Sequence, residues 1–190
     1  MLKIAFYGKS GVGKSTIALE TIEYFQNQDM EVEVVKLAYP LYVIQKLFYD
    51  IAHVKMNFYD QNQKLLENIA TFLREINPEC IVENFQERYK QSKAEVIIND
   101  DIREIEVDYP FLKKEGFIFV KVQCNEKLRI DRLKKRNDLN SILNSKTTQH
   151  IEKIVPDFIV DTSHKDINIT KNKLYKYLEQ IRSGKDDINR

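Results

Sequence analysis

Eight consecutive residues near the amino end have the types and spacing of a phosphate-binding loop. They match the pattern G-x-x-x-x-G-K-[ST] and, with the threonine that follows, comprise Gly8, Lys9, Ser10, Gly11, Val12, Gly13, Lys14, Ser15 and Thr16. Glycines let a backbone wrap closely around phosphate groups, so that its amide N–H groups converge on phosphate oxygens. The pattern predicts that these residues bind ATP, with Lys14 on the β- and γ-phosphates and the Ser15 hydroxyl on Mg²⁺. A glycine-rich turn without function is the alternative, but three of the chain's five glycines lie inside this loop.

Two aspartates, Asp100 and Asp101, directly follow an apolar segment that we expect to be a strand. An acid at this place can hold Mg²⁺ opposite Ser15, and the sequence does not decide which of the two would do so. A solvated turn or a helix N-cap is the alternative, because aspartate caps helices well. Arg103 is a candidate for clamping a phosphoryl group bidentately, although a surface ion pair with a neighbouring glutamate would suit it as well.

Three arginines are spaced so that they line one face of a predicted helix. Arg129, Arg132 and Arg136 are separated by three and four residues and precede a polar segment that ends near His150. This arrangement favours a small helical lid, at approximately 126–150, that closes over phosphates during transfer. A solvated basic face would have a similar pattern. A nucleic-acid patch is less favoured, since the segment has no aromatic residues among its basic ones.

The elements that must position these residues alternate along the chain. Five short apolar segments are expected strands: Leu2–Tyr7, Glu31–Leu37, Ala94–Asn99, Phe117–Val122 and Asp157–Asp161. Helical periodicity is expected at Thr16–Gln28, Leu41–Ile51, Leu65–Ile76, Ile81–Tyr89, Glu104–Glu115, Asn125–Arg136 and Ile167–Ile181, with Pro110 kinking or splitting the fifth of these.

This alternation predicts an α/β fold with a parallel sheet covered on both faces. We expect a three-layer P-loop NTPase fold with five parallel strands, formed by a single domain over 1–190 with a polar tail at 183–190. Ligands of such sheets lie outside the carboxyl ends of the strands. The loop, the segment Lys36–Pro40 and the aspartate pair should therefore share one rim.

Composition and charge point to a cytoplasmic protein without a membrane or nucleic-acid partner. The formal net charge is only +1, so no electrostatic excess favours either partner. The first residues form an expected strand rather than a signal peptide, and no apolar run is long enough to span a bilayer. The cysteines, Cys80 and Cys124, are far apart in the sequence, and we expect buried free thiols in a reducing cytosol.

Several stretches, taken in order, resemble the deoxynucleoside monophosphate kinase family of phages and bacteria, within the P-loop nucleoside monophosphate kinases. Only the phosphate-binding loop is specific to such proteins by itself. The other stretches support the resemblance through their order and spacing along the chain. They are Leu37–Leu41, Leu73–Pro78 running into Val82–Phe85, Ile98–Arg103, and Arg132–Arg136 followed by Asp157–Asp161.

The resemblance implies transfer of the ATP γ-phosphoryl group to a nucleoside or deoxynucleoside monophosphate. By this likeness Arg74 and Arg103 would hold the acceptor monophosphate, while Arg132 and Arg136 would stabilise charge on the transferring group beside Lys14. The partner would be a small-molecule nucleotide, and homodimerisation stays open.

The segment after the second strand departs from the family. Lys36 and Tyr39 are assigned to the acceptor site, with Tyr39 standing where the family has an aspartate. Ser15 stands where the family often has an aspartate, and Val107 where it has a glutamate. The acceptor is therefore the part of the assignment that the resemblance supports least.

A second family, the dimerising regulatory ATPases of the partitioning and nitrogenase-iron-protein type, has a similar loop. This chain's loop differs from theirs only at Ser10, and their equivalent of Lys9 reaches the partner's nucleotide. However, they carry an Asp-x-x-Gly switch, whereas here no glycine follows Asp101 until Gly116. An ATP-binding protein without kinase activity is the third alternative.

Overall fold

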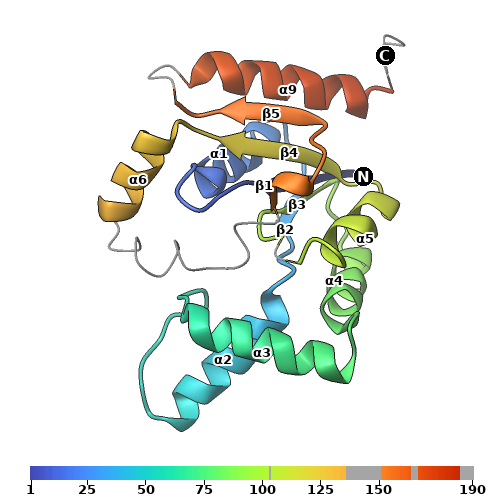
Figure 1. The fold of residues 1–190 in the computed structure, drawn as a ribbon. Coiled ribbons are helices and arrows are strands. Elements are labelled where there is room, and N and C mark those ends of the chain that lie inside the picture. Colours follow the sequence, from blue (N-terminus) through green and yellow to red (C-terminus); the bar gives the residue numbers. More distant parts are fainter. Residues whose placement is uncertain (103, 136–150, 164–166, 185–190) are drawn as a thin grey trace.

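A five-stranded parallel sheet forms the centre of the computed structural model, which describes residues 1–102, 104–135, 151–163 and 167–184 (Figure 1). Its strands are β1 (Leu2–Tyr7), β2 (Val32–Val34), β3 (Val96–Asn99), β4 (Ile118–Gln123) and β5 (Phe158–Asp161). All neighbouring strands are parallel, in the order β2-β3-β1-β4-β5. Because β1 is central, the loop that follows it opens at the middle of the carboxyl edge.

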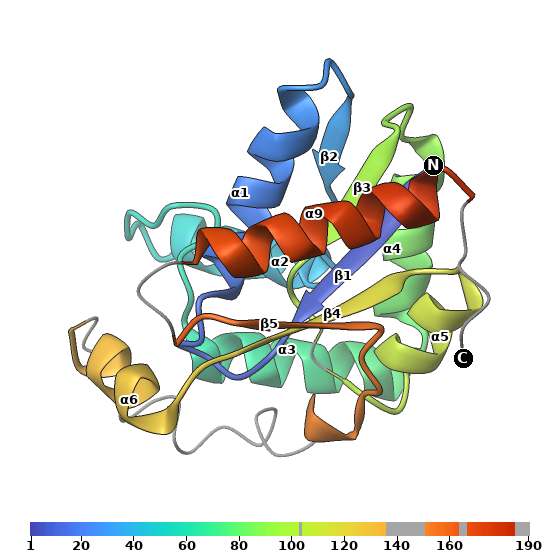
Figure 2. The same ribbon diagram turned by 90° about the horizontal axis from the view of Figure 1, so that it is seen from above.

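Helices cover both faces of this sheet, as the alternation of elements predicts (Figures 1 and 2). They are α1 (Lys14–Gln26), α2 (Tyr39–Ile51), α3 (Gln63–Ile76), α4 (Cys80–Gln91), α5 (Asp108–Lys114), α6 (Glu126–Lys135) and α9 (Asn168–Arg182), with a short 3₁₀ helix η1 (Ile151–Lys153). None of the helices in the described part combines the length and apolar character needed to cross a bilayer.

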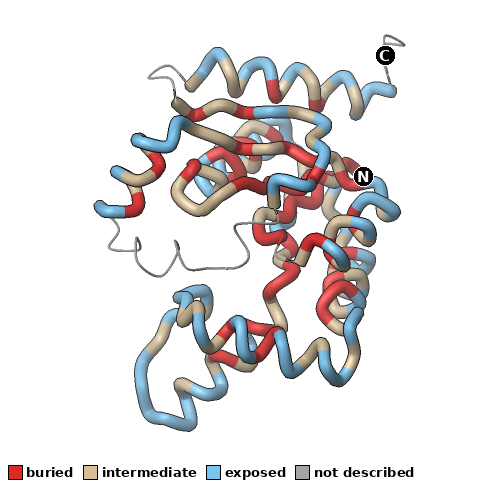
Figure 3. The backbone as a smooth tube through the Cα atoms, viewed as in Figure 1, coloured by how far each residue is buried: buried red, intermediate tan, exposed pale blue. Residues whose placement is uncertain are grey.

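Two hydrophobic clusters lie on opposite faces of the sheet. Figure 3 shows that the central strands between them are largely buried. Ile4 and Phe6 of β1 point into the cluster shared with α1 and α9, whereas Ala5 and Tyr7 point into the one shared with α4 and α5. Since side chains alternate along a strand, a strand covered on both faces must be apolar at nearly every position. This explains why the strands are continuous apolar runs in the sequence.

Helices α2 and α3 pack against each other and project away from the sheet on the side of α4 (Figure 1). We call residues 39–76 the arm. Helix α3 begins at an asparagine cap, because the Asn62 side chain accepts a hydrogen bond from the backbone N–H of Leu65.

Two elements are shorter than the sequence predicts. The expected strand Glu31–Leu37 is regular only over Val32–Val34, with a further hydrogen bond from Val35 N to the Ile98 carbonyl oxygen, because the chain then turns toward α2. The expected helix Glu104–Glu115 begins only at Asp108, which places Pro110 in its first turn, where no N–H donor is required. The predicted kink or split at this proline is therefore wrong, because the helix begins at Asp108, two residues before it.

Candidate active site

The loop between β1 and α1 has the backbone geometry of a phosphate-binding loop. Gly8, Gly11 and Gly13 have φ angles of 144°, 84° and 101°, a region that residues with a Cβ rarely adopt. Gly8 also lies close to the neighbouring strand, because an added Cβ would be 2.1 Å from the Val122 carbonyl oxygen. Helix α1 begins immediately afterwards at Lys14, so its unpaired first-turn N–H groups and the positive end of its dipole face the loop.

The Lys14 side chain folds back over this loop. Its Nζ donates hydrogen bonds to the carbonyl oxygens of Gly8, at 2.8 Å, and Lys9, at 3.3 Å. This contact places a positive charge on the loop, as the sequence pattern predicts for a phosphate-binding lysine. Ser15, in the first turn of α1, is exposed.

Helix α6 is fixed against the loop by two arginines. Arg132 Nη1 donates to the carbonyl oxygen of Val12 at 3.1 Å and to the Thr162 hydroxyl at 3.1 Å. The Thr162 hydroxyl in turn donates to the same Val12 oxygen at 2.6 Å. Arg129 Nη1 donates to the Ser10 carbonyl oxygen at 3.2 Å. Both guanidinium groups therefore lie on the face of α6 that meets the loop.

Arg129 is too well buried for the alternative of a solvated basic face. Its side chain is 6% exposed and forms an ion pair with Glu126. Hydrogen bonding within this pair raises the pKa of Arg129 and lowers the pKa of Glu126. Gly11 completes the contact, since a Cβ there would lie 2.9 Å from Leu133 Cγ.

The two rim aspartates have different environments. Both carboxylate oxygens of Asp101 accept backbone hydrogen bonds, from Leu37 N at 2.8 Å and Ala38 N at 3.0 Å, and one of them also accepts from Asn99 Nδ2 at 2.8 Å. Asp101 thereby directs the chain from β2 into α2, which is why β2 ends early.

Asp100 pairs with Lys36 instead of with the backbone. Burial lowers the pKa of Lys36, but the charges of Asp100 and Asp101 outweigh this effect and the pKa is raised. Because Asp101 is occupied by amide groups, Asp100 is the better candidate for a metal-binding acid.

The available donors fit Mg²⁺. Ser15 supplies an exposed hydroxyl and Asp100 a carboxylate with 12% side-chain exposure. Hard oxygen donors of this kind suit Mg²⁺, which also keeps waters and binds substrate phosphates. Within the described residues no cluster of three or more histidine, cysteine, aspartate or glutamate side chains suggests another metal centre.

Arg74, in the last turn of α3, lies where the arm meets the start of α5. Its Nη2 is 3.9 Å from Asp108 Oδ1, and the two side chains are 22% and 1% exposed. Arg74 Nε is buried without a hydrogen-bond partner among the described residues. A buried donor of this kind is costly unless a ligand satisfies it, which is consistent with the predicted anion-binding role.

An aromatic cluster that sequence reasoning identified only in part lies next to Lys36. Tyr39 and Phe58 have ring centroids 5.6 Å apart, and Phe58 and Tyr59 have centroids 4.8 Å apart. Lys36 Nζ is 5.7 Å from the centroid of the Tyr59 ring, and Tyr59 is 50% exposed. Tyr42 is buried and packs against Phe58 and Tyr59.

Arg88, on α4, is a site residue that the sequence analysis missed. Its guanidinium lies 4.6 Å from the centroid of the Tyr39 ring, and its Nη2 donates to the Lys36 carbonyl oxygen at 2.6 Å. Burial lowers the pKa of this guanidinium. One signal was present in the sequence: Arg88 follows Phe85 by three residues and therefore lies beside the apolar stripe of its helix.

Some predicted residues are outside the part of the chain that the structure describes. These are Arg103, Arg136 and the segment 136–150 of the predicted lid. Of the lid, only α6 can be placed.

Comparison with known proteins gives matches among solved structures only. No family model and no curated protein sequence matches this chain. The crystal structure of TT1252 from Thermus thermophilus is similar over 94% of this chain and 97% of its own, with a TM-score of 0.56 and 11% identity. The crystal structure of APE1195 is similar over 95% of both chains, with a TM-score of 0.51 and 16% identity.

The parallel strand order, the glycine loop after β1 and this similarity decide the fold class. The chain has the three-layer P-loop NTPase fold. The predicted fold class is thus confirmed. A gluconokinase from Sinorhizobium meliloti 1021 is also similar, with a TM-score of 0.49 and 15% identity over 96% of this chain and 97% of its own, which is too distant to inform the substrate.

We predict that replacing Asp101 destabilises the P-loop NTPase fold more than replacing its neighbour. Asp101→Ala removes the acceptor for two backbone amides and one side-chain amide. Because a hydrogen bond to a charged group contributes about 1.5–3 kcal/mol and three are lost together, we expect the free energy of unfolding to fall by at least about 3 kcal/mol. Asp100→Asn keeps an oxygen that can accept a hydrogen bond from Lys36 and removes only one ion pair, so its cost should be clearly smaller than that of Asp101→Ala. Equal losses in urea denaturation would contradict the assigned difference between the two acids.

We predict that Arg132 acts through its forked geometry and not through charge alone. Arg132 uses Nη1 for the Val12 carbonyl oxygen and the Thr162 hydroxyl, and Nη2 for the Thr162 carbonyl oxygen at 3.3 Å. Lysine has a single nitrogen in place of this fork, so Arg132→Lys should raise the KM for ATP by roughly 10-fold. Lys135→Ala is the matched control, since Lys135 is exposed on the same helix, and its KM should stay within roughly twofold of wild type. A similar change in both variants would indicate that α6 acts only as a basic surface.

Proposed function

We propose that this protein transfers the γ-phosphoryl group of ATP to a nucleoside or deoxynucleoside monophosphate, giving ADP and a nucleoside diphosphate. The observation that carries the proposal is the loop after β1, with its three positive-φ glycines, the overlying Lys14 and the arginines of α6. Such a loop converges amide groups and positive charge on a polyphosphate.

The acceptor part of the proposal is supported by groups on α3, on α4 and in the segments next to α2. Arg74 retains an unsatisfied buried donor suited to a phosphate. The exposed ring of Tyr59 and the partly exposed ring of Tyr39 provide surfaces on which a nucleobase could stack. Lys36 and Arg88 lie against these rings and add positive charge near the acceptor.

Catalysis by these residues would consist of positioning and electrostatic stabilisation. Lys14 would hold the β- and γ-phosphates, and the loop amides would fix their orientation. Mg²⁺, held by Ser15 and Asp100, would neutralise charge on the transferring group when bound. Arg132, which already contacts the loop backbone, would stabilise charge at the loop during transfer. No covalent enzyme intermediate is required.

The remaining assignments belong to the same proposal. Arg103 would hold the acceptor phosphate with Arg74, and Arg136 would act with Arg132 from the lid. All nine loop residues from Gly8 to Thr16 would contact ATP. The partner would be the small nucleotide acceptor, and neither a nucleic acid nor a membrane would be bound. The protein would act in the cytoplasm.

Measurement of ADP release across a panel of acceptors tests this function. Ribonucleoside and deoxyribonucleoside monophosphates would be compared with sugars and other small hydroxyl acceptors, each with ATP and Mg²⁺. We expect release to depend on one or a few monophosphates. Release that depends on a hydroxyl acceptor would instead indicate a small-molecule kinase. Acceptor-independent hydrolysis would favour the regulatory ATPase, and ATP binding without release would favour a binding protein.

A further inference from the structure

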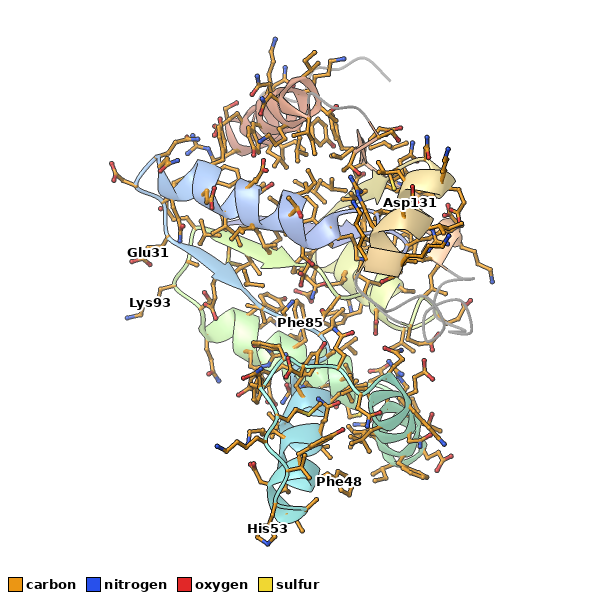
Figure 4. The ribbon with its side chains drawn as sticks, turned by 90° about the vertical axis from the view of Figure 1, so that its left-hand side faces the viewer. Glu31, Phe48, His53, Phe85, Lys93 and Asp131 are labelled. Atoms are coloured by element: carbon orange, nitrogen blue, oxygen red, sulfur yellow. The ribbon has the colours of Figure 1, made fainter. Side chains whose placement is uncertain are left out.

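One ion pair links the arm to the helix that follows the rim aspartates. Arg74, in the last turn of α3, faces Asp108, the first residue of α5, and its Nη2 is 3.9 Å from Asp108 Oδ1. Figure 4 shows that the arm projects away from the sheet, with Phe48 and His53 on its distant part. A long side chain on such a projection needs a fixed contact with the rest of the molecule if it is to keep one position relative to the loop.

Asp108 is itself fixed by its surroundings. Its side chain is 1% exposed, and its Oδ2 accepts a hydrogen bond from the Glu104 backbone N–H at 2.8 Å. The Asp108 backbone N–H donates in return to the Glu104 carbonyl oxygen at 2.7 Å. Val107 and Tyr109, on either side of it, pack against the hydrophobic cluster that also contains Ile69 of α3. The carboxylate therefore has a defined position where the arm meets α5.

The ion pair leaves donors of Arg74 available to a third group. A guanidinium that hydrogen-bonds a carboxylate directly has N···O distances of about 2.7–2.9 Å, whereas Nη2 and Oδ1 are 3.9 Å apart. Arg74 Nε is buried and has no hydrogen-bond partner among the described residues. The Arg74 side chain is 22% exposed, so it is not sealed from solvent. Asp108 thus orients the guanidinium by charge and leaves donors that an anionic ligand can satisfy.

We propose that Asp108 is a positioning residue for the acceptor phosphate and acts through Arg74. The inference rests on the proposed function, in which Arg74 binds the monophosphate of the acceptor. The buried carboxylate holds the guanidinium fork so that its N–H groups meet the phosphate oxygens together. It also supplies a counter-charge to the partly buried arginine while the acceptor is absent. Since this contact acts on the acceptor before and during transfer alike, its loss should raise the KM for the acceptor without lowering kcat.

Steady-state kinetics of the full chain, with ATP and the monophosphate that the panel identifies, test this inference. Asp108→Asn keeps an oxygen for the Glu104 N–H but loses the charge that faces Arg74. We expect the KM for the acceptor to rise by roughly 10-fold, with kcat and the KM for ATP within roughly twofold of wild type. Glu106→Gln is the matched control. Glu106 also forms a long ion pair, at 3.8 Å with Lys153, but its side chain is 75% exposed, so its loss should change none of these constants.

A second set of variants separates positioning from stability. Arg74→Gln alone should raise the KM for the acceptor by roughly 30-fold, the loss expected for a hydrogen bond to a charged group. Arg74→Gln with Asp108→Asn removes both charges, so that neither is left buried alone. Because Asp108 acts only through Arg74, the KM of this double variant should stay within roughly twofold of that of Arg74→Gln. Circular dichroism and thermal unfolding report folding, and if Asp108→Asn alone does not fold, the double variant still decides.

The outcomes are distinct. A rise in the KM for the acceptor alone in Asp108→Asn, absent when Arg74 is already replaced, supports the inference. An unchanged KM for the acceptor in Asp108→Asn, a parallel rise in the KM for ATP, or additive effects in the double variant would overturn it and leave the proposed function intact. A wild-type protein without monophosphate-dependent ADP release would overturn the proposed function, and this inference with it, before any variant is compared.

Discussion

Lys14→Ala should lower the rate of phosphoryl transfer by roughly 10³-fold or more while leaving the fold intact, since removal of a single stabilising donor alone costs 10²–10³-fold. The ammonium lies over the loop and bonds to the Gly8 and Lys9 carbonyl oxygens. Its loss removes the positive charge that would neutralise the transferring phosphoryl group. Single-turnover transfer with the acceptor identified by the panel measures the effect, and circular dichroism reports the fold.

Two other lysines make this result interpretable. Lys171→Ala, on α9 and paired with Glu20, controls for general loss of charge and should leave transfer unchanged. Lys9→Ala distinguishes a kinase from a dimerising regulatory ATPase. The Lys9 side chain faces Glu152, at 3.8 Å. If the protein is a kinase, the rate of phosphoryl transfer should therefore fall by less than roughly tenfold. A loss in Lys9→Ala as large as that in Lys14→Ala would favour the regulatory ATPase. Full transfer by Lys14→Ala would remove the central assignment.

Gly8→Ala should prevent the loop and the sheet edge from forming together. Its Cβ would lie 2.1 Å from the Val122 carbonyl oxygen, a backbone atom that cannot move away alone, and its φ is +144°. A side-chain atom forced against a fixed backbone atom is among the most destabilising changes a substitution can make. We therefore expect the free energy of unfolding to fall by at least about 3 kcal/mol. Thermal and urea unfolding measure the effect.

Gly116→Ala is the matched control for backbone strain. Gly116 also has a positive φ, +76°, but an added Cβ would meet nothing within 4 Å. Only the conformational cost remains, which we expect to be about 1–2 kcal/mol. If the two alanine variants were equally destabilised, strain and not the contact with β4 would explain the requirement for glycine at position 8.

The loop and the sheet could be predicted from the sequence because their signals are local. Three glycines, a lysine and a serine at fixed spacing specify the loop, and apolar runs alternating with helical periodicity specify the layers. The strand order could not be derived in this way, because pairing between β1 and β3 joins segments about ninety residues apart.

The distinct roles of the rim residues depend on tertiary contacts and could not be predicted. Asp100 and Asp101 are adjacent and identical in the sequence. Only the tertiary structure shows that Asp100 pairs with Lys36, whereas Asp101 accepts hydrogen bonds from the backbone at Leu37 and Ala38. Arg88 of α4 contacts Tyr39 at the start of α2. The position of Arg88 within its own helix indicated that it is partly buried, but not that it contacts Tyr39.

The hydrogen bond between Thr162 and the Val12 carbonyl joins residues 150 positions apart. Together with the contacts of Arg132, it means that the shape of the loop is completed by a segment synthesised about 150 residues after it. A nascent chain that has emerged from the ribosome only as far as β3 would carry the whole glycine motif and yet lack these supports. Such long-range closure is slow, and nucleotide capture would therefore begin only after β5 has joined the sheet.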